Sequence, residues 1–161
     1  MDIMGKQAPE LRVPIWIGPD GKPREPLRLA DLGPGYKILF CYQHWCPGCH
    51  SDGFPTLIRL VNALWDKGFG FAVIQTVFEG AEQNTVERLH EEQQRYGLRL
   101  PFGHDPMREG GMHSTLMEDY RTGGTPWFIL IDPSGDVLFS HFHFDAGHFL
   151  RALGLEKAAS V

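Results

Sequence analysis

The stretch that decides the fold of this chain is YKILFCYQHWCPGC, residues 36–49. Its first half, residues 36–42, is a continuous apolar run of the kind that forms a strand buried on both faces of a sheet. Its second half ends in WCPGC, residues 45–49, with two cysteines three residues apart. Apolar residues then recur at three- and four-residue spacing from Phe54 to Trp65, which predicts an amphipathic helix. The cysteines therefore lie at a junction between a strand and a helix.

The pair Cys46 and Cys49 is placed to cycle between dithiol and disulfide. Residues at i and i+3 are neighbours on one helix face, so their Cα atoms should lie within the roughly 4.4–6.8 Å that a disulfide spans. Cys46 falls in the first turn, where unpaired N–H groups and the helix dipole stabilise an anion by up to about 2 kcal/mol. Pro47 supplies a helical φ without needing a donor, and His44 and His50 are minor candidates to assist. Cys46 is thus the expected nucleophile and Cys49 the shielded resolving thiol.

Two other uses of the pair are open. Zinc normally takes four ligands, and no second Cys-x-x-Cys or spaced histidine pair completes a set, so no metal site is expected. The run CPGCH, residues 46–50, also fits the attachment pattern of c-type haem. Haem attachment needs export and a distal ligand, and the absent leader and the strand just upstream argue against it. Redox exchange is favoured, with the Cys46–Cys49 disulfide in place of any separate cofactor.

Composition limits the remaining classes. The 161 residues fit one domain, expected to span 1–161 with an N-terminal extension at 1–35 and a core at 36–154. Three cysteines are too few for a disulfide framework, and a net charge of −5 argues against a nucleic-acid partner. No apolar run reaches the roughly 18 residues that span a bilayer, so no membrane is expected. The start shows no leader, which predicts a cytoplasmic location, or a periplasmic or secreted one if a leader has been trimmed.

Strand and helix signals alternate along the chain and indicate a mixed sheet with helices on both faces. Gly53 and Pro55 should kink the helix that follows the cysteines. The other expected elements are a strand or hairpin within 14–29, a strand at 69–78, a helix opened by a capping box at 84–87 and ending at Gly97, a short strand at 100–102, a short helix at 113–120, a hairpin at 127–142 and a final helix from Asp145.

Thr125-Pro126 precedes the expected hairpin. Proline at the start of a strand breaks no ladder bond, so an ordinary turn proline is one interpretation. The other is a cis peptide bond that places the backbone of Thr125 beside the sulfurs, where its N–H and C=O would hold an extended substrate by strand addition.

In combination these motifs resemble the thioredoxin-like superfamily, most closely TlpA-like thiol:disulfide oxidoreductases of the redoxin group. The resemblance covers nearly the whole chain. It is carried in order by APEL (8–11), DGK (20–22), LADL (29–32), WCPGC (45–49), Thr125-Pro126 and IDPSG (131–135). It implies an α/β thioredoxin-like fold with a mixed central sheet, helices on both faces and an N-terminal strand or hairpin extension.

The resemblance also implies a reaction. A mixed disulfide would form on Cys46 and be resolved by Cys49, with protein or small-molecule thiols and disulfides as partners and a dithiol as electron donor. Trp45 and Pro47, next to the nucleophile, and Thr125 and Pro126 would contact the substrate.

Several features depart from the family pattern. The segment from Cys49 to Pro55 looks one residue longer than usual, so Asp52 is not equated with the acidic proton acceptor often found there. The strand before the motif also lacks an aspartate, which leaves the proton acceptor of Cys49 unidentified. Cys41 on that strand is expected to be a small buried hydrophobe, with a relay thiol as the alternative. His141 and His143 would share a strand face and are expected to be exposed; weak metal binding is the alternative.

Two rival functions follow from the same residues. A peroxiredoxin-like peroxidase would use Cys49 to attack peroxide, with Arg121 to stabilise its thiolate. Against it, Cys46 occupies the position of the expected Thr or Ser, and Tyr42 that of the expected proline. A redox-inert binding module using the groove beside Thr125-Pro126 is the third class.

Overall fold

The computed structural model describes residues 2–111 and 113–156. Its strands are β1 (Ile15–Ile17), β2 (Pro23–Arg24), β3 (Lys37–Tyr42), β4 (Gly70–Thr76), β5 (Phe102–Asp105), β6 (Trp127–Ile131) and β7 (Val137–His141). Its α-helices are α1 (Phe54–Leu64), α2 (Arg88–Arg95), α3 (Thr115–Tyr120) and α4 (Ala146–Ala152). Short 3₁₀ helices occupy Leu29–Leu32 and Glu109–Gly111, and a π-helical turn spans Cys49–Gly53.

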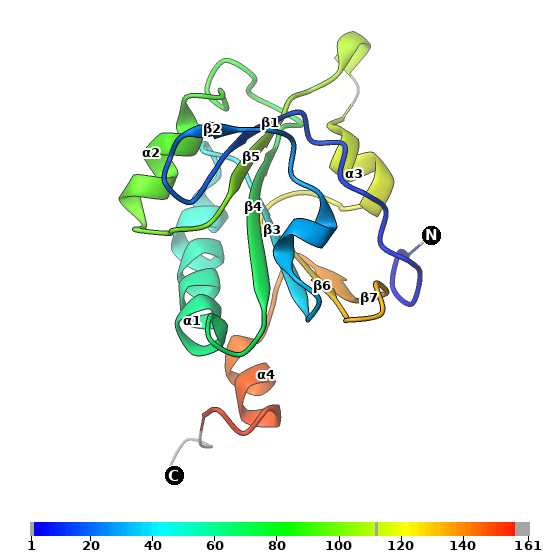
Figure 1. Cartoon of the computed structure of the whole chain (residues 1–161). Coiled ribbons are helices and arrows are strands. Elements are labelled where there is room, and N and C mark those ends of the chain that lie inside the picture. The colour runs from blue at the N-terminus through cyan, green and yellow to red at the C-terminus, as the bar shows by residue number, and fades with distance from the viewer. Residues whose placement is uncertain (1, 112, 157–161) are drawn as a thin grey trace.

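The strands form one seven-stranded sheet in the order β2-β1-β5-β4-β3-β6-β7. β3, β4 and β5 are parallel to one another, whereas β1, β2, β6 and β7 join through antiparallel pairs. β3 lies between β4 and β6, so both of its edges are hydrogen-bonded, and all six of its residues are buried. The mixed sheet expected from the sequence is therefore confirmed, and the residues that precede 36 extend it through β1 and β2 (Figure 1).

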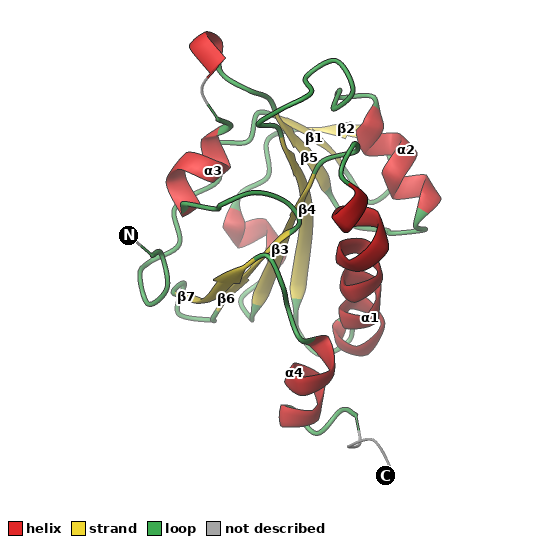
Figure 2. Ribbon diagram, turned by 180° about the vertical axis from the view of Figure 1, so that it is seen from behind, coloured by secondary structure: helices red, strands yellow, loops and turns green. Residues whose placement is uncertain are grey.

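Each face of the sheet carries its own apolar core. On one face, alternate residues of β3 such as Phe40 and Tyr42 pack with Cys49 and with the apolar sides of α1, α2 and α4. On the other face, Leu39 and Cys41 pack with the N-terminal segment and α3. Figure 2 shows α1 and α2 on the opposite side of the sheet from α3. Alternation of side chains along β3 thus places Cys41 on the opposite face of the sheet from Phe40, Tyr42 and the buried Cys49. In the part of the chain described, no helix has the length and apolar character needed to cross a membrane.

Two boundaries differ from the sequence expectations. The predicted capping box is wrong, because α2 begins at Arg88 and Asn84 does not cap it. The side chain of Asn84 is buried, where it accepts a hydrogen bond from the Trp45 N–H and donates one to the carbonyl oxygen of Glu79. The third strand lies at 102–105, not 100–102, because pairing with β4 begins at Phe102. Tertiary partners therefore decide both boundaries.

The expected kink near Gly53 and Pro55 takes the form of a π-helical turn. Pro47 and Gly48 are already helical, and the chain then widens into the π turn before α1 continues. The N–H of Phe54 donates to the carbonyl oxygen of Cys49, five residues back. A π turn accommodates one more residue than an α turn, and such turns are common at functional sites. This π turn lies in the segment between Cys49 and Pro55 that was expected to be one residue longer than the family pattern.

Candidate active site

The candidate site forms where the carboxyl end of β3 meets the first helical turn and the loop that enters β6. The strand ends at Tyr42, and the turn before Pro47 brings the cysteine pair to the sheet edge. The loop before β6 contributes Thr125 and Pro126 from the other direction. Segments 79 residues apart in sequence are thus brought together at the sulfurs.

Cys46 and Cys49 are joined as a disulfide, with Cα atoms 5.3 Å apart, within the predicted range. Their environments differ: Cys46 is partly exposed, whereas Cys49 is completely buried against the core of α1. The backbone N–H of Cys49 points at Cys46 Sγ at 3.3 Å, so a donor of the first turn faces the accessible sulfur. Such a donor stabilises a thiolate there once the bond is reduced.

The Thr125–Pro126 peptide bond is cis, which is the second of the two interpretations that the sequence left open. Cys46 Sγ lies 3.6 Å from both the carbonyl oxygen and the hydroxyl oxygen of Thr125. The ring of Pro126 packs on the helix start, since a Cβ added to Gly53 would come within 2.9 Å of it. The proline loop and the cysteine turn are therefore in direct contact, with Thr125 beside the accessible sulfur.

Trp45 and Pro47 flank the accessible cysteine and face solvent. Trp45 is 63% exposed, which is unusual for so large an apolar side chain. A hydrogen bond fixes its backbone, because the Trp45 N–H donates to Asn84 Oδ1 at 2.8 Å. Gly80 in the same loop is so close that a Cβ there would lie 3.3 Å from the indole. The exposed indole of Trp45 is therefore carried by a hydrogen-bonded backbone next to Cys46, the partly exposed cysteine of the pair.

A buried polar cluster that the sequence did not reveal lies beside the cysteine turn. Glu92 of α2 has no exposed surface, and its Oε1 lies 2.5 Å from His44 Nδ1 and 3.8 Å from His50 Nε2. His50 also bridges His44 and α2: its Nε2 donates to the His44 carbonyl oxygen, and its Nδ1 lies 2.5 Å from the Tyr96 hydroxyl. The signal that could have revealed Glu92 is the spacing of Leu89 and Tyr96, which marks the buried face of an otherwise polar helix.

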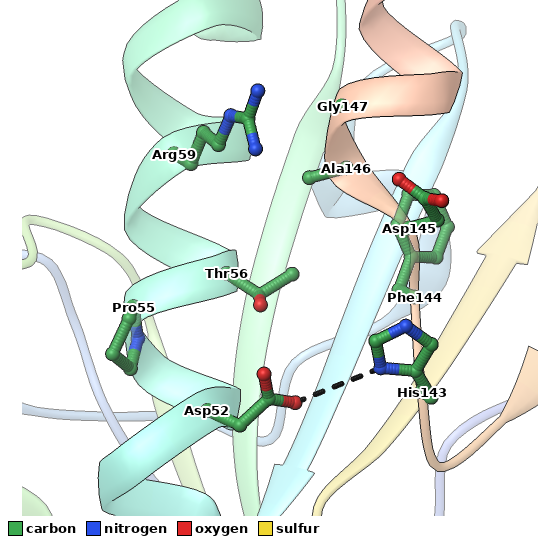
Figure 3. Close-up of a pocket in the computed structure, with 9 residues that line it drawn as sticks. All are labelled: Asp52, Pro55, Thr56, Arg59, His143, Phe144, Asp145, Ala146 and Gly147. Atoms are coloured by element: carbon green, nitrogen blue, oxygen red, sulfur yellow. Dashed lines mark ion pairs between the residues drawn. The ribbon is translucent and has the colours of Figure 1, made fainter.

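Asp52 lies at a separate cavity of about 380 Å³ between α1 and the start of α4. Its carboxylate is 54% exposed and faces His143 Nδ1 at 3.8 Å, as Figure 3 shows. Arg59 and Asp145 line the same cavity. This open, solvated position gives no support to Asp52 as a buried proton acceptor for Cys49.

The remaining sequence candidates lie elsewhere. Cys41 is buried on the opposite face of the sheet, and burial raises the pKa of its thiol far above the ordinary value. Arg121 is exposed and follows α3 with a positive φ of 56°. His141 and His143 are both exposed, as expected. Cys41 therefore adds no third thiol to the Cys46–Cys49 pair.

Comparison with known proteins agrees with this geometry. A model of the AhpC/TSA family matches residues 4–140. Human nucleoredoxin is 24% identical over 112 residues, which cover 70% of this chain and 24% of nucleoredoxin, so the chain spans about a quarter of that relative.

Solved structures extend the match across the chain. A thioredoxin-like superfamily protein shares 29% identity and a TM-score of 0.78, with 96% of this chain and 99% of that chain covered. A thiol-disulfide isomerase from Corynebacterium glutamicum shares 26% identity and a TM-score of 0.75, with 94% and 98% covered. A thiol:disulfide interchange protein from Chlorobium tepidum, at 22% identity and a TM-score of 0.63, covers 96% and 97% and shares the fold. The thioredoxin-like fold expected from the sequence is confirmed.

Proposed function

The chain belongs to the AhpC/TSA family, and we propose that it is a thiol–disulfide oxidoreductase that exchanges its Cys46–Cys49 pair with disulfides of proteins or small molecules. In the reducing direction, the Cys46 thiolate attacks one sulfur of the substrate disulfide. A Cys46–substrate bond forms and the second substrate sulfur leaves as a thiolate. Cys49 then loses its proton and attacks Cys46, which restores the Cys46–Cys49 disulfide and releases the reduced substrate. A dithiol donor returns two electrons to the pair.

The difference in accessibility between the two sulfurs carries this assignment. A substrate sulfur can approach only an exposed thiol, and Cys46 is the exposed member of the pair. Cys49, with no exposed surface, meets only the sulfur to which it is already adjacent. That order of access supports attack by Cys46 and resolution by Cys49 over the reverse.

The surroundings of Cys46 suit an extended peptide. The Thr125 carbonyl oxygen lies 3.6 Å from the sulfur, so a substrate backbone paired with Thr125 would bring its own cysteine to the same place. Trp45 and Pro47, which flank Cys46 in the sequence, supply exposed apolar surface. We therefore assign substrate contact to Trp45, Pro47, Thr125 and Pro126.

The peroxidase alternative requires peroxide to reach Cys49. Complete burial of that sulfur against α1 disfavours it, because the attacking thiolate must be open to a small polar substrate. The binding-module alternative uses the groove beside Thr125 without any change in the cysteines. An intact, bonded pair in contact with Thr125 favours exchange instead.

Insulin reduction and peroxide consumption, each with a dithiol donor, separate the three functions. Wild type should reduce insulin, Cys46→Ser should lose that activity, and no variant should consume peroxide faster than the donor alone. Retention of wild-type insulin reduction by Cys46→Ser would overturn the assignment. Peroxide consumption that needs Cys49 but not Cys46 would establish the peroxidase, and inactivity in both assays would favour the binding module.

A further inference from the structure

His44, His50 and Glu92 surround one point beside the redox pair. They come from three segments: the loop after β3, the π turn and α2. One ligand atom of each, an imidazole nitrogen or a carboxylate oxygen, lies within 4.8 Å of the other two. From this geometry we propose that the three side chains bind a divalent transition-metal ion such as Zn²⁺, as a site separate from the cysteines.

The buried carboxylate is the first reason. Glu92 has no exposed surface, and removing a carboxylate from water is costly unless a positive group or strong donors compensate. Oε1 faces His44, but Oε2 has no hydrogen-bond partner among the described residues, and the nearest guanidinium nitrogen, on Arg95, is 3.8 Å away. A metal ion bound at the carboxylate would supply positive charge closer than the Arg95 guanidinium does.

The chemistry of the donors is the second reason. Two imidazoles and one carboxylate are ligands typical of Zn²⁺, which takes nitrogen and oxygen at about 2.0–2.2 Å and leaves a fourth position for water. Ligands at that distance from one ion lie roughly 3–4 Å apart, so the 3.8 Å between His50 Nε2 and Glu92 Oε1 already fits. The 2.5 Å contact of His44 Nδ1 with Oε1 is a hydrogen bond, which must open when the ion replaces its proton.

The surroundings also orient the ligands. Tyr96 Oη lies against His50 Nδ1, the kind of outer contact that fixes the ring of a metal-binding histidine. His50 Nε2 donates to the His44 carbonyl oxygen, and this hydrogen bond, like that of His44 with Glu92, must open when the ion replaces its proton. His50 stacks on Tyr96 and Phe54, with ring centroids 5.9 and 5.7 Å apart. His44 and His50 retain 21% and 19% side-chain exposure, so an ion can reach them from solvent. The sequence predicted no metal site because Glu92 lies 42 residues beyond His50 on a helix that reads as polar.

Zinc titration of the disulfide-bonded protein tests this site, because oxidised cysteines offer no thiolate to the ion. By calorimetry, wild type should bind one Zn²⁺ per chain, and Glu92→Gln, which keeps the shape and the contact with His44, should bind at least about tenfold more weakly. His44→Ala should show the same loss and serves if Glu92→Gln does not fold. Co²⁺ should give visible bands without thiolate charge transfer.

Two controls locate the binding. His90→Ala changes an exposed histidine on α2, and His141→Ala with His143→Ala removes the exposed pair near β7; both should leave zinc affinity unchanged. The proposal is overturned if wild type binds no zinc, if binding survives Glu92→Gln and His44→Ala, or if it disappears with His141 and His143. Insulin reduction is not part of this readout, so its loss or retention bears only on the redox assignment.

Discussion

At the residue scale, the reactivity of Cys46 depends on a few donors around one sulfur. The Cys49 N–H faces it from the helix start, and the Thr125 hydroxyl lies 3.6 Å away on the loop before β6. Backbone donors are fixed by the fold, whereas the hydroxyl is supplied by one side chain. The contribution of Thr125 can therefore be removed without moving the cysteines.

We expect Thr125→Val to slow alkylation of reduced Cys46. The substitution keeps the shape but removes a hydroxyl that can donate to the thiolate, a loss of about 1 kcal/mol or up to about fivefold in the thiolate population. Because a less stabilised thiolate is also more nucleophilic, the alkylation rate at neutral pH should fall by about twofold. Iodoacetamide kinetics followed by mass spectrometry measure it. Thr56→Val, at the cavity beside Arg59, is the matched control and should react like wild type. An unchanged rate in Thr125→Val would show that the backbone donors alone stabilise the thiolate.

At the element scale, the π turn and the neighbouring strands hold the site in place. Gly53 sits where the turn passes between Phe40 and Pro126, and an added Cβ would lie 2.8 Å from the Phe40 ring and 2.9 Å from Pro126. Gly48, one turn earlier, has room, because its Cβ would lie 3.5 Å from Pro126. Both glycines have helical φ values, so space and not backbone conformation distinguishes them.

Gly53→Ala should therefore lower the free energy of unfolding by about 1–3 kcal/mol through overpacking. Gly48→Ala should change it little or raise it by up to about 1 kcal/mol, because alanine restricts the unfolded chain. Urea denaturation of the oxidised proteins compares them. Equal stability of the two variants would mean that the contact between the π turn and the proline loop is loose.

A hydrogen bond between side chains of the neighbouring strands β4 and β5 should depend on pH. Gln75 Nε2 donates to His104 Nδ1, while Gln75 Oε1 accepts from the His44 N–H. Burial, opposed by Glu87, lowers the pKa of His104 from its ordinary 6.5. Because the folded pKa lies below the unfolded one, the neutral ring contributes stability above about pH 6.5 that is lost as the pH falls through the folded pKa.

The stability difference between wild type and His104→Asn should therefore shrink as the pH falls from about 7.5 to 5. Asparagine does not titrate, and the other histidines are common to both proteins. Urea midpoints across the range give the difference. A difference that stays constant over this range would show that His104 has no depressed pKa.

Whether a feature could be predicted from the sequence depends on how far apart along the chain its interacting residues lie. Local patterns were enough for β3, α1 and the hairpin of β6 and β7, and the order of motifs was enough for the thioredoxin-like fold. Asn84 reads as a helix cap but binds Trp45, and Glu92 reads as solvent-exposed but is buried beside His44. Those two depend on partners 39 and 48 residues away, which no local pattern encodes.

At the scale of the whole molecule, the sheet separates two cores, and only one of them contacts the Cys46–Cys49 pair. Cys49 packs on the α1 face and Cys41 on the α3 face. A relay between them would have to cross the backbone of β3. Burial also raises the pKa of Cys41, so it stays a thiol at neutral pH.

Cys41→Ala should accordingly keep the rate of insulin reduction of wild type. Its stability should fall modestly, as for loss of a small buried side chain. Differential alkylation and peptide mapping during turnover should find no disulfide that includes Cys41. A bond from Cys41 to either member of the pair would instead make it a relay thiol.

The assignment of Cys46 as the attacking thiol and Cys49 as the resolving thiol is tested most directly by trapping the mixed disulfide. Reduced Cys49→Ser and Cys46→Ser are each mixed with a peptide disulfide and analysed by non-reducing mass spectrometry. The exposed sulfur of Cys46 should accumulate a peptide adduct in Cys49→Ser, because no resolving thiol remains, while Cys46→Ser should stay unmodified. An adduct on Cys49 in Cys46→Ser, formed as fast as the one on Cys46, would contradict the assignment of Cys46 as the nucleophile.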